Sequence, residues 1–146
     1  MMKTTLILFI LAACAVIACV CEDNVHSREK RNFFQFGRMI KRRTGRSALD
    51  YNGYGCWCGL GGKGTPKDGV DRCCRAHDYC YDRLIKSGCR SPVWNSYRYT
   101  LRWGIYCYRG GNDRCELGGC RCDRTAAYCF ARNTYHNKYK NWKGSC

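Results

Sequence analysis

Apolar residues recur with a helical period just after residue 31. Phe33, Phe36 and Ile40 follow the i, i+3, i+7 spacing of one face of an amphipathic helix, while basic residues occupy other faces. This pattern predicts a short N-terminal helix.

The middle of the chain combines a glycine-rich stretch with helix end signals. Residues 53–64 contain six glycines, which predicts a loop with unusual backbone angles. Thr65 followed by Pro66 suits an N-cap and a first helical position, and Gly88 suits a helix stop. We therefore expect a long helix over residues 66–87.

The second half of the chain predicts a strand, a hairpin and another helix. Residues 97–103 alternate between apolar and polar side chains before Gly104, which is the period of a half-exposed strand and favours a β-hairpin. Asp113 and Glu116 form a capping-box pattern. They predict a second long helix that runs to about residue 132.

The first 31 residues have the organisation of export and processing signals. Thirteen apolar residues, Leu6 to Ala18, predict a secretory signal peptide over residues 1–21, with cleavage between about 18 and 21. Arg28-Glu29-Lys30-Arg31 resembles a convertase site. We therefore expect a pro-segment at 22–31 and a single mature domain at 32–146.

Cysteine usage agrees with export. Three of the fifteen cysteines precede residue 32, which leaves an even number, twelve, and predicts six disulfides in an oxidising compartment. The alternatives are a zinc site, which the leader and the lack of repeated paired spacings disfavour, and a bacterial lipoprotein box at residues 11–14, which the cysteine-rich mature domain disfavours.

The mature segment is strongly basic. Four of the 26 Lys and Arg residues and three of the 11 Asp and Glu residues precede residue 32, which leaves 22 and 8 and a net charge of +14. Anionic membranes and sulfated glycans fit this charge. Export and the absence of a nucleic-acid motif exclude nucleic acid as the expected partner. The plainer alternative is that the charge only maintains solubility.

Candidate chemistry lies in the first long helix. At about 100° per residue, Cys73, His77 and Tyr81 share one helical stripe, and Asp78 lies on the neighbouring one. His77 and Asp78 can therefore face one cleft.

The second long helix repeats the cysteine spacing of the first. The four cysteines concerned are Cys73, Cys80, Cys122 and Cys129. Pairing the first with the last and the second with the third would staple two antiparallel helices and bring Asp123 within a helical turn of His77. This is a hypothesis, because twelve cysteines allow roughly ten thousand pairings.

The glycine-rich loop suggests a cation site. A hard cation such as Ca²⁺ takes six to eight oxygen ligands, which loop carbonyls and a carboxylate can supply. A Cys58–Cys74 pair would hold the loop four residues from Asp78. The EF-hand pattern is absent, so the site would be of another kind.

Three segments together resemble a known family. They are Tyr54-Gly55-Cys56-Trp57-Cys58-Gly59-Leu60-Gly61-Gly62, Asp71-Arg72-Cys73-Cys74-Arg75-Ala76-His77-Asp78-Tyr79-Cys80-Tyr81, and Cys122-Asp123. In order and spacing they resemble the secreted phospholipase A2 family over essentially all of residues 32–146. Within the family the chain is most similar to groups V and II: residues 96–104 are most like group V, and Tyr79 stands where group II members have a cysteine. The pro-segment instead resembles those of groups I and X.

The resemblance implies a mainly α, disulfide-rich fold. Two long antiparallel helices stapled by disulfides, a short N-terminal helix, a calcium loop and a small β-hairpin are expected. The implied disulfides are Cys56–Cys146, Cys58–Cys74, Cys73–Cys129, Cys80–Cys122, Cys89–Cys115 and Cys107–Cys120.

The resemblance also implies Ca²⁺-dependent hydrolysis of the sn-2 ester of glycerophospholipids at a membrane surface, with His77 as general base. The residues so implied are, for catalysis, His77, Asp123, Tyr81, Tyr97 and Gly59; for one Ca²⁺ ion, Trp57, Gly59, Gly61 and Asp78; and for the acyl channel, Phe33, Phe36 and Ile40. At the membrane interface they are Phe34, Arg38, Lys41, Arg42, Arg43, Leu60 and Trp94. The tyrosines and the channel residues, each taken alone, also fit an ordinary core.

Two departures and an alternative remain. Trp57 stands where relatives have tyrosine or histidine, and Val93 and Trp94 replace a phosphate-binding Tyr or Lys. The competing class is a catalytically weak, basic module that binds membranes or heparan sulfate, as a toxin or antibacterial protein. We expect an extracellular monomer that acts on anionic membranes, with heparan sulfate or a receptor as further candidate partners.

Overall fold

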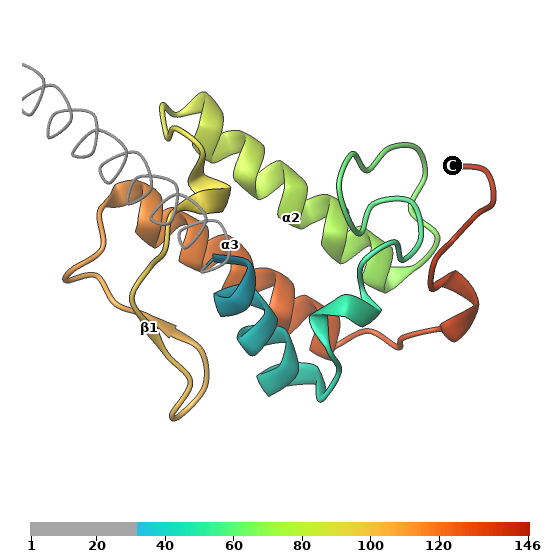
Figure 1. The fold of residues 1–146 in the computed structure, drawn as a ribbon, viewed down its shortest axis with the longest axis horizontal. Helices are drawn as coiled ribbons and strands as arrows, with labels where there is room; N and C mark the ends of the chain where they lie inside the picture. The colour runs from blue at the N-terminus through green and yellow to red at the C-terminus, as the bar shows by residue number, and fades with distance from the viewer. Residues whose placement is uncertain (1–31) are drawn as a thin grey trace, which may run out of the picture.

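The computed structural model describes residues 32–146, and helices are the main regular elements (Figure 1). Residues 32–44 are helical, as the apolar spacing predicts. The signal peptide and pro-segment expected at 1–31 lie outside the described residues. The other elements are the 3-10 helices η1 (Ala48–Asp50), η2 (Pro92–Trp94) and η3 (Asn137–Tyr139), the helices α2 (Gly69–Lys86) and α3 (Arg114–Ala131), and the strands β1 (Tyr99–Thr100) and β2 (Tyr106–Cys107).

Helix α2 begins later than the sequence predicts. Asp68 is its N-cap, and the Asp68 side chain accepts the N–H of Asp71 at 2.9 Å. Thr65 does not cap the helix, which begins four residues later at Gly69, and its N–H donates to the carbonyl oxygen of Cys146 at 3.1 Å. Pro66 therefore precedes the helix. Aspartate is a stronger N-cap than threonine, which favours the later start.

Helix α3 begins and ends where the sequence predicts. The Asp113 side chain accepts the N–H groups of Cys115 and Glu116, and the Glu116 side chain accepts the N–H of Asp113, which completes the capping box. Arg132 is the C-cap. Helix α2 also stops as expected, at Lys86, before Gly88 with its φ of +93°.

The two long helices are antiparallel and stapled, as predicted. Cys73 pairs with Cys129 and Cys80 pairs with Cys122, with Cα–Cα distances of 5.8 and 5.7 Å. As the residue number of the cysteine in α2 rises, the number of its disulfide partner in α3 falls. The two helices therefore run in opposite directions side by side (Figure 1). Gly118 allows this close approach, because a Cβ there would lie 2.5 Å from a methyl carbon of Leu84.

All twelve cysteines of the described residues are paired. The remaining four disulfides are Cys56–Cys146, Cys58–Cys74, Cys89–Cys115 and Cys107–Cys120. With the two staples, they are the six pairs that the resemblance implies. They attach the glycine-rich loop, the C-terminal segment and the hairpin to the helix pair.

The predicted hairpin is present, but the strand at 97–103 is shorter than expected. Strand β1 pairs with β2 in antiparallel register, with Tyr99 opposite Cys107. The chain turns at Gly104, whose φ is +125° and where a Cβ would lie 3.1 Å from the hydroxyl oxygen of Tyr128. Trp103 is consequently 90 % exposed instead of lying on an inward face.

Helix α3 contributes to both apolar clusters of the core. One cluster joins Val70 of α2 to Phe130 of α3 and to Ile40 of the N-terminal helix. The other packs Met39 and Ile105 against α3. No helix within residues 32–146 is both long and apolar enough to cross a membrane.

Candidate functional site

A histidine and an aspartate from the two stapled helices form the centre of the site. The Nε2 atom of His77 lies 2.7 Å from Oδ1 of Asp123. The His77 side chain is 18 % exposed and that of Asp123 is 1 % exposed. The disulfides on either side fix the helix register, so this contact follows from the covalent framework.

Two tyrosines complete the surroundings of the buried carboxylate. The hydroxyl of Tyr81 donates to Oδ1 of Asp123 at 2.9 Å, and that of Tyr97 donates to Oδ2 at 2.5 Å. Burial and the negative charge of Asp123 raise the pKa of both phenols, so both remain protonated donors at neutral pH. Asp123 thus stays buried with three donors compensating its charge.

The geometry fixes the tautomer of His77. An ionised carboxylate only accepts hydrogen bonds, so the Nε2 atom of neutral His77 carries the proton that faces Asp123. Nδ1 is then the free base, and within residues 32–146 it has no hydrogen-bond partner. Phe36 stacks on the imidazole with ring centroids 4.6 Å apart, and the Tyr81 ring meets it edge-on at 4.9 Å. These rings hold the orientation of the base and shield one of its faces.

The glycine-rich loop lies beside α2 in a conformation that depends on glycine. Gly59 and Gly61 have φ angles of +127° and +75°, which disfavour other L residues. The Cys58–Cys74 disulfide holds the loop to α2, one helical turn before Asp78. The N–H of Gly59 donates to no acceptor in the described part of the chain.

Asp78 is a partly buried carboxylate that could serve as a cation ligand. Partial burial raises its pKa from 3.8 to about 6, with a further rise from Asp82 and an opposing effect of His77. Within residues 32–146 no Lys or Arg forms an ion pair with it. These residues contain no group of three or more His, Cys, Asp or Glu side chains that could by itself hold a metal ion. One carboxylate with loop carbonyls is an all-oxygen donor set, which fits Ca²⁺ better than a transition metal.

Comparison with known proteins shows the family of this chain. A family model described as phospholipase A2 matches residues 33–140. The chain belongs to the phospholipase A2 family.

Several phospholipases A2 of known sequence are similar over most of the chain. The acidic phospholipase A2 Vur-PL3 of Vipera renardi is 50 % identical over 133 residues, covering 88 % of this chain and 90 % of that protein. The group IIE secretory phospholipase A2 of Homo sapiens is 48 % identical over 114 residues, covering 76 % and 78 %. The group IIC secretory enzyme of Rattus norvegicus is 47 % identical over 115 residues, covering 75 % and 76 %. A group II-like assignment fits these relatives, and the secretory names of the rat and human proteins, with the six disulfides, indicate an extracellular protein.

The expected channel residues of this phospholipase A2 family member occupy different environments. Phe36 lies against the imidazole of His77. Phe33 is 55 % exposed, and Ile40 is buried in the core at 2 % exposure. Of the three, only Phe36 contacts His77 through its ring.

The residues expected at the membrane interface are exposed, but not all on one face. Phe34, Leu60 and Trp94 are 61 %, 106 % and 46 % exposed. Arg43 is nine residues after Phe34, half a turn away around the helix, and its guanidinium lies 4.3 Å from the ring centroid of Tyr128. Arg43 is therefore directed toward α3, away from the face of Phe34.

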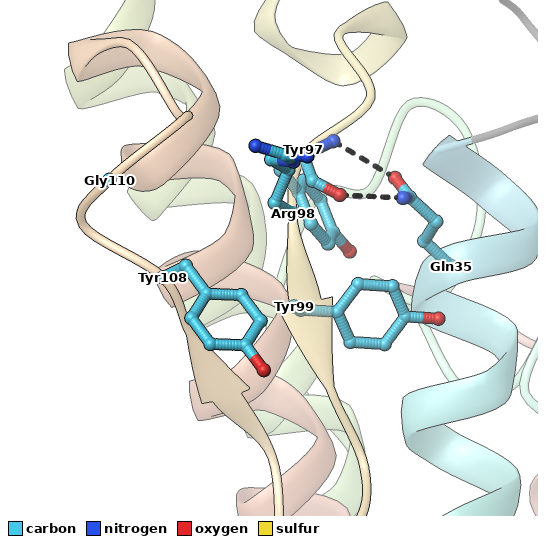
Figure 2. A pocket seen from close by; sticks show the side chains of 6 residues that line it. All are labelled: Gln35, Tyr97, Arg98, Tyr99, Tyr108 and Gly110. Carbon is cyan, nitrogen blue, oxygen red and sulfur yellow. Dashed lines mark hydrogen bonds between the residues drawn. The ribbon is translucent and has the colours of Figure 1, made fainter.

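An open cavity of about 520 Å³ has Tyr97, but neither His77 nor Asp123, in its lining. Figure 2 shows its lining, Gln35, Tyr97, Arg98, Tyr99, Tyr108 and Gly110. The Gln35 side-chain amide bonds the carbonyl oxygen and the N–H of Tyr97 at 2.7 and 3.2 Å. Tyr97 thus lines this cavity while its hydroxyl donates to Asp123.

One buried acidic residue received no role from the sequence. Asp71 is fully buried beside the glycine-rich loop and accepts hydrogen bonds from it. Its position in the first turn of α2, next to the cysteine run, is the signal that would have revealed it. The predicted helix start at Pro66 obscured that signal, because it placed Asp71 farther inside the helix.

Proposed function

We propose that this protein is a secreted, Ca²⁺-dependent phospholipase A2 that hydrolyses the sn-2 ester of glycerophospholipids to a fatty acid and a lysophospholipid. The observation that carries the proposal is the pair of His77 and Asp123, placed beside Asp78 and a glycine-rich loop. Membership of the family supports the same reaction.

In this proposal His77 is the general base. Nδ1 of His77 takes a proton from a water molecule, which attacks the ester carbonyl, so no serine or cysteine nucleophile is needed. Asp123 accepts the Nε2–H bond, and its charge stabilises the imidazolium that forms. The hydroxyls of Tyr81 and Tyr97 keep the carboxylate in place. Protonated His77 then returns the proton to the leaving alcohol.

The carbonyl oxygens of Trp57, Gly59 and Gly61 and the carboxylate of Asp78 would hold one Ca²⁺ ion. When bound there, the ion supplies positive charge to the ester carbonyl oxygen and to the lipid phosphate. The N–H of Gly59, which has no acceptor within residues 32–146, is an additional donor for the developing oxyanion.

The substrate surface in this proposal is an anionic membrane. Phe34, Leu60 and Trp94 offer exposed apolar side chains for insertion. The mature charge of +14 supplies long-range attraction to anionic lipid. Heparan sulfate or a receptor would be additional partners of the basic surface, and the protein would act as a monomer.

The test is fatty-acid release from anionic and zwitterionic vesicles, with Ca²⁺ or with excess EGTA. We expect hydrolysis of the sn-2 ester only with Ca²⁺. His77→Gln should abolish turnover while Ca²⁺ binding persists, and His136→Gln, on the exposed segment after α3, is the matched control. Undiminished hydrolysis in EGTA, or a larger loss in His136→Gln, would contradict the proposal. Vesicle binding without hydrolysis would support the non-catalytic module.

We also propose that the signal peptide and the pro-segment are removed, with cleavage after Arg31. Asn32 is 3 % exposed, and its side-chain amide donates to the carbonyl oxygens of Pro92 and Asn95 at 3.2 and 2.9 Å. In this proposal these contacts hold the first residue of the mature chain near η2, and an uncleaved extension there lowers activity. Arg31→Ala should give a secreted, folded and weakly active form, as measured by mass spectrometry and vesicle hydrolysis. Equal activity of the cleaved and uncleaved forms would argue against an inhibitory pro-segment.

A further inference from the structure

Asp71 is a buried carboxylate outside the catalytic pair and outside the proposed Ca²⁺ ligands. Its exposed fraction is 0 %. Oδ2 accepts the N–H groups of Cys56 and Lys67, both at 2.8 Å, and Oδ1 accepts the N–H of Trp57 at 2.8 Å. In the part of the chain that the structure describes, no Lys or Arg forms an ion pair with it. Backbone N–H groups therefore compensate its charge, together with the N-terminus of α2, where Asp71 lies in the first turn.

The loop approaches this carboxylate as closely as the backbone allows. Gly55 has a φ of +60°, and a Cβ there would lie 2.4 Å from Cγ of Asp71. A side chain at this position would displace either the loop or the carboxylate. Glycine at 55 and aspartate at 71 thus form a matched pair.

These contacts determine the direction of the Trp57 carbonyl. Asp71 holds the N–H groups of Cys56 and Trp57, and so orients the two peptide units that precede that carbonyl. The next peptide unit contains the Trp57 carbonyl and the N–H of Cys58, which donates to the carbonyl oxygen of Tyr54 at 3.2 Å. Because the C=O and N–H of a trans peptide point in opposite directions, the Trp57 oxygen faces away from Tyr54. Within residues 32–146 no donor bonds this oxygen.

We propose that Asp71 is a positioning residue that holds the Trp57 carbonyl in the orientation required for Ca²⁺ binding. The inference rests on the proposed function, since it gives the glycine-rich loop the role of a Ca²⁺ site. Asp71 does not touch the ion. It acts through the backbone, and the Cys58–Cys74 disulfide restrains the following residue independently.

Asp71→Asn is the sharpest test because it preserves the shape of the side chain. An amide has one acceptor oxygen, so its NH₂ group must face at least one of the three backbone N–H donors. The orientation that keeps two bonds directs NH₂ at the N–H of Trp57. Asp113→Asn, which removes a carboxylate at the start of α3 and keeps a good N-cap, is the matched control.

Ca²⁺ binding is measured by titration calorimetry, and amide hydrogen exchange is followed by NMR in the metal-free protein. We expect the Kd for Ca²⁺ to rise at least tenfold in Asp71→Asn and to change less than twofold in Asp113→Asn. Exchange should accelerate at Cys56 and Trp57 but not in α3, and hydrolysis should recover as Ca²⁺ is raised. A purely structural role would accelerate exchange throughout and give no recovery.

The outcomes separate this inference from the proposed function. A folded Asp71→Asn protein with an unchanged Kd for Ca²⁺ overturns the inference and leaves the function intact. A wild-type protein that neither binds Ca²⁺ nor hydrolyses vesicles overturns both. If Asp71→Asn does not fold, the wild-type exchange decides: an unprotected Trp57 amide in the metal-free protein refutes the anchoring, and a protected one supports it.

Discussion

Tyr97→Phe and Tyr99→Phe remove the same hydroxyl group from two nearby residues, and we expect opposite effects on stability. Tyr97 is 4 % exposed, and its hydroxyl is the donor that the described residues place on Oδ2 of Asp123. The hydroxyl of Tyr99 is buried and has no partner within those residues. The comparison therefore isolates the value of one hydrogen bond.

The magnitude follows from the burial of Asp123. A hydrogen bond to a charged group contributes about 1.5 to 3 kcal/mol, and a buried acceptor left without a donor adds its desolvation cost. In the Tyr97→Phe variant, Asp123 keeps His77 and Tyr81 as donors to Oδ1, but the described residues supply no other donor to Oδ2. Tyr97→Phe should thus lower the free energy of unfolding by about 2 to 3 kcal/mol. Tyr99→Phe removes an unsatisfied group and should change stability by about 0 to 1 kcal/mol, in the stabilising direction.

The assay is guanidinium unfolding with the disulfides intact, followed by tryptophan fluorescence and extrapolated to water. The slope against denaturant should be the same for both variants and the wild type. Turnover of Tyr97→Phe should fall less than tenfold, because His77 keeps its bond to Asp123. Equal destabilisation by the two substitutions, or a loss below 0.5 kcal/mol for Tyr97→Phe, would refute the hydrogen-bond network described around Asp123.

Two further predictions concern the metal and the membrane surface. Burial raises the pKa of Asp78 to about 6, and Ca²⁺ binds the ionised carboxylate. The affinity for Ca²⁺ should therefore be constant above that pH and fall by up to about tenfold per pH unit below it. Calorimetry from pH 5 to 8 measures this, and a pH-independent Kd for Ca²⁺ would contradict the assignment of Asp78 as a ligand. Arg38 lies one turn after Phe34 on the same face of the N-terminal helix, and Arg43 lies on the opposite face. Arg38→Glu should therefore weaken binding to anionic vesicles by about 2 kcal/mol, and Arg43→Glu should weaken it by much less. Sedimentation with vesicles at two salt concentrations distinguishes them, and equal losses would show that only net charge matters.

Local sequence patterns determined the elements and their order. The amphipathic spacing from Phe33, the capping box at Asp113 and the stop at Gly88 correspond to helix boundaries in the structure. These signals succeed because they depend on residues within one or two turns. The equal seven-residue spacing of two cysteine pairs also predicted the antiparallel staples, since a periodic helix converts spacing into position along its axis.

The start of α2 and the length of β1 depended on distant contacts. The N–H of Thr65 is bonded to Cys146, far away in sequence, and the helix begins only after Asp68. The hairpin turns where Gly104 meets Tyr128 of α3, and alternation along residues 97–103 carries no information about that contact. Local propensity is a weak guide wherever a partner far away in sequence supplies the competing hydrogen bond or the packing surface.

For the site, the sequence indicated which residues to examine, and the tertiary structure decided what each one contacts. The contact of His77 with Asp123 was predicted because the helix register fixes it. The separation of Arg43 from Phe34 depends on the position of Tyr128, and the burial of Asp71 depends on how Gly55 and the loop fold back on α2. Spacing along one helix determines which residues share its face, but only packing against the other elements determines which face becomes buried and which backbone groups a carboxylate must hold.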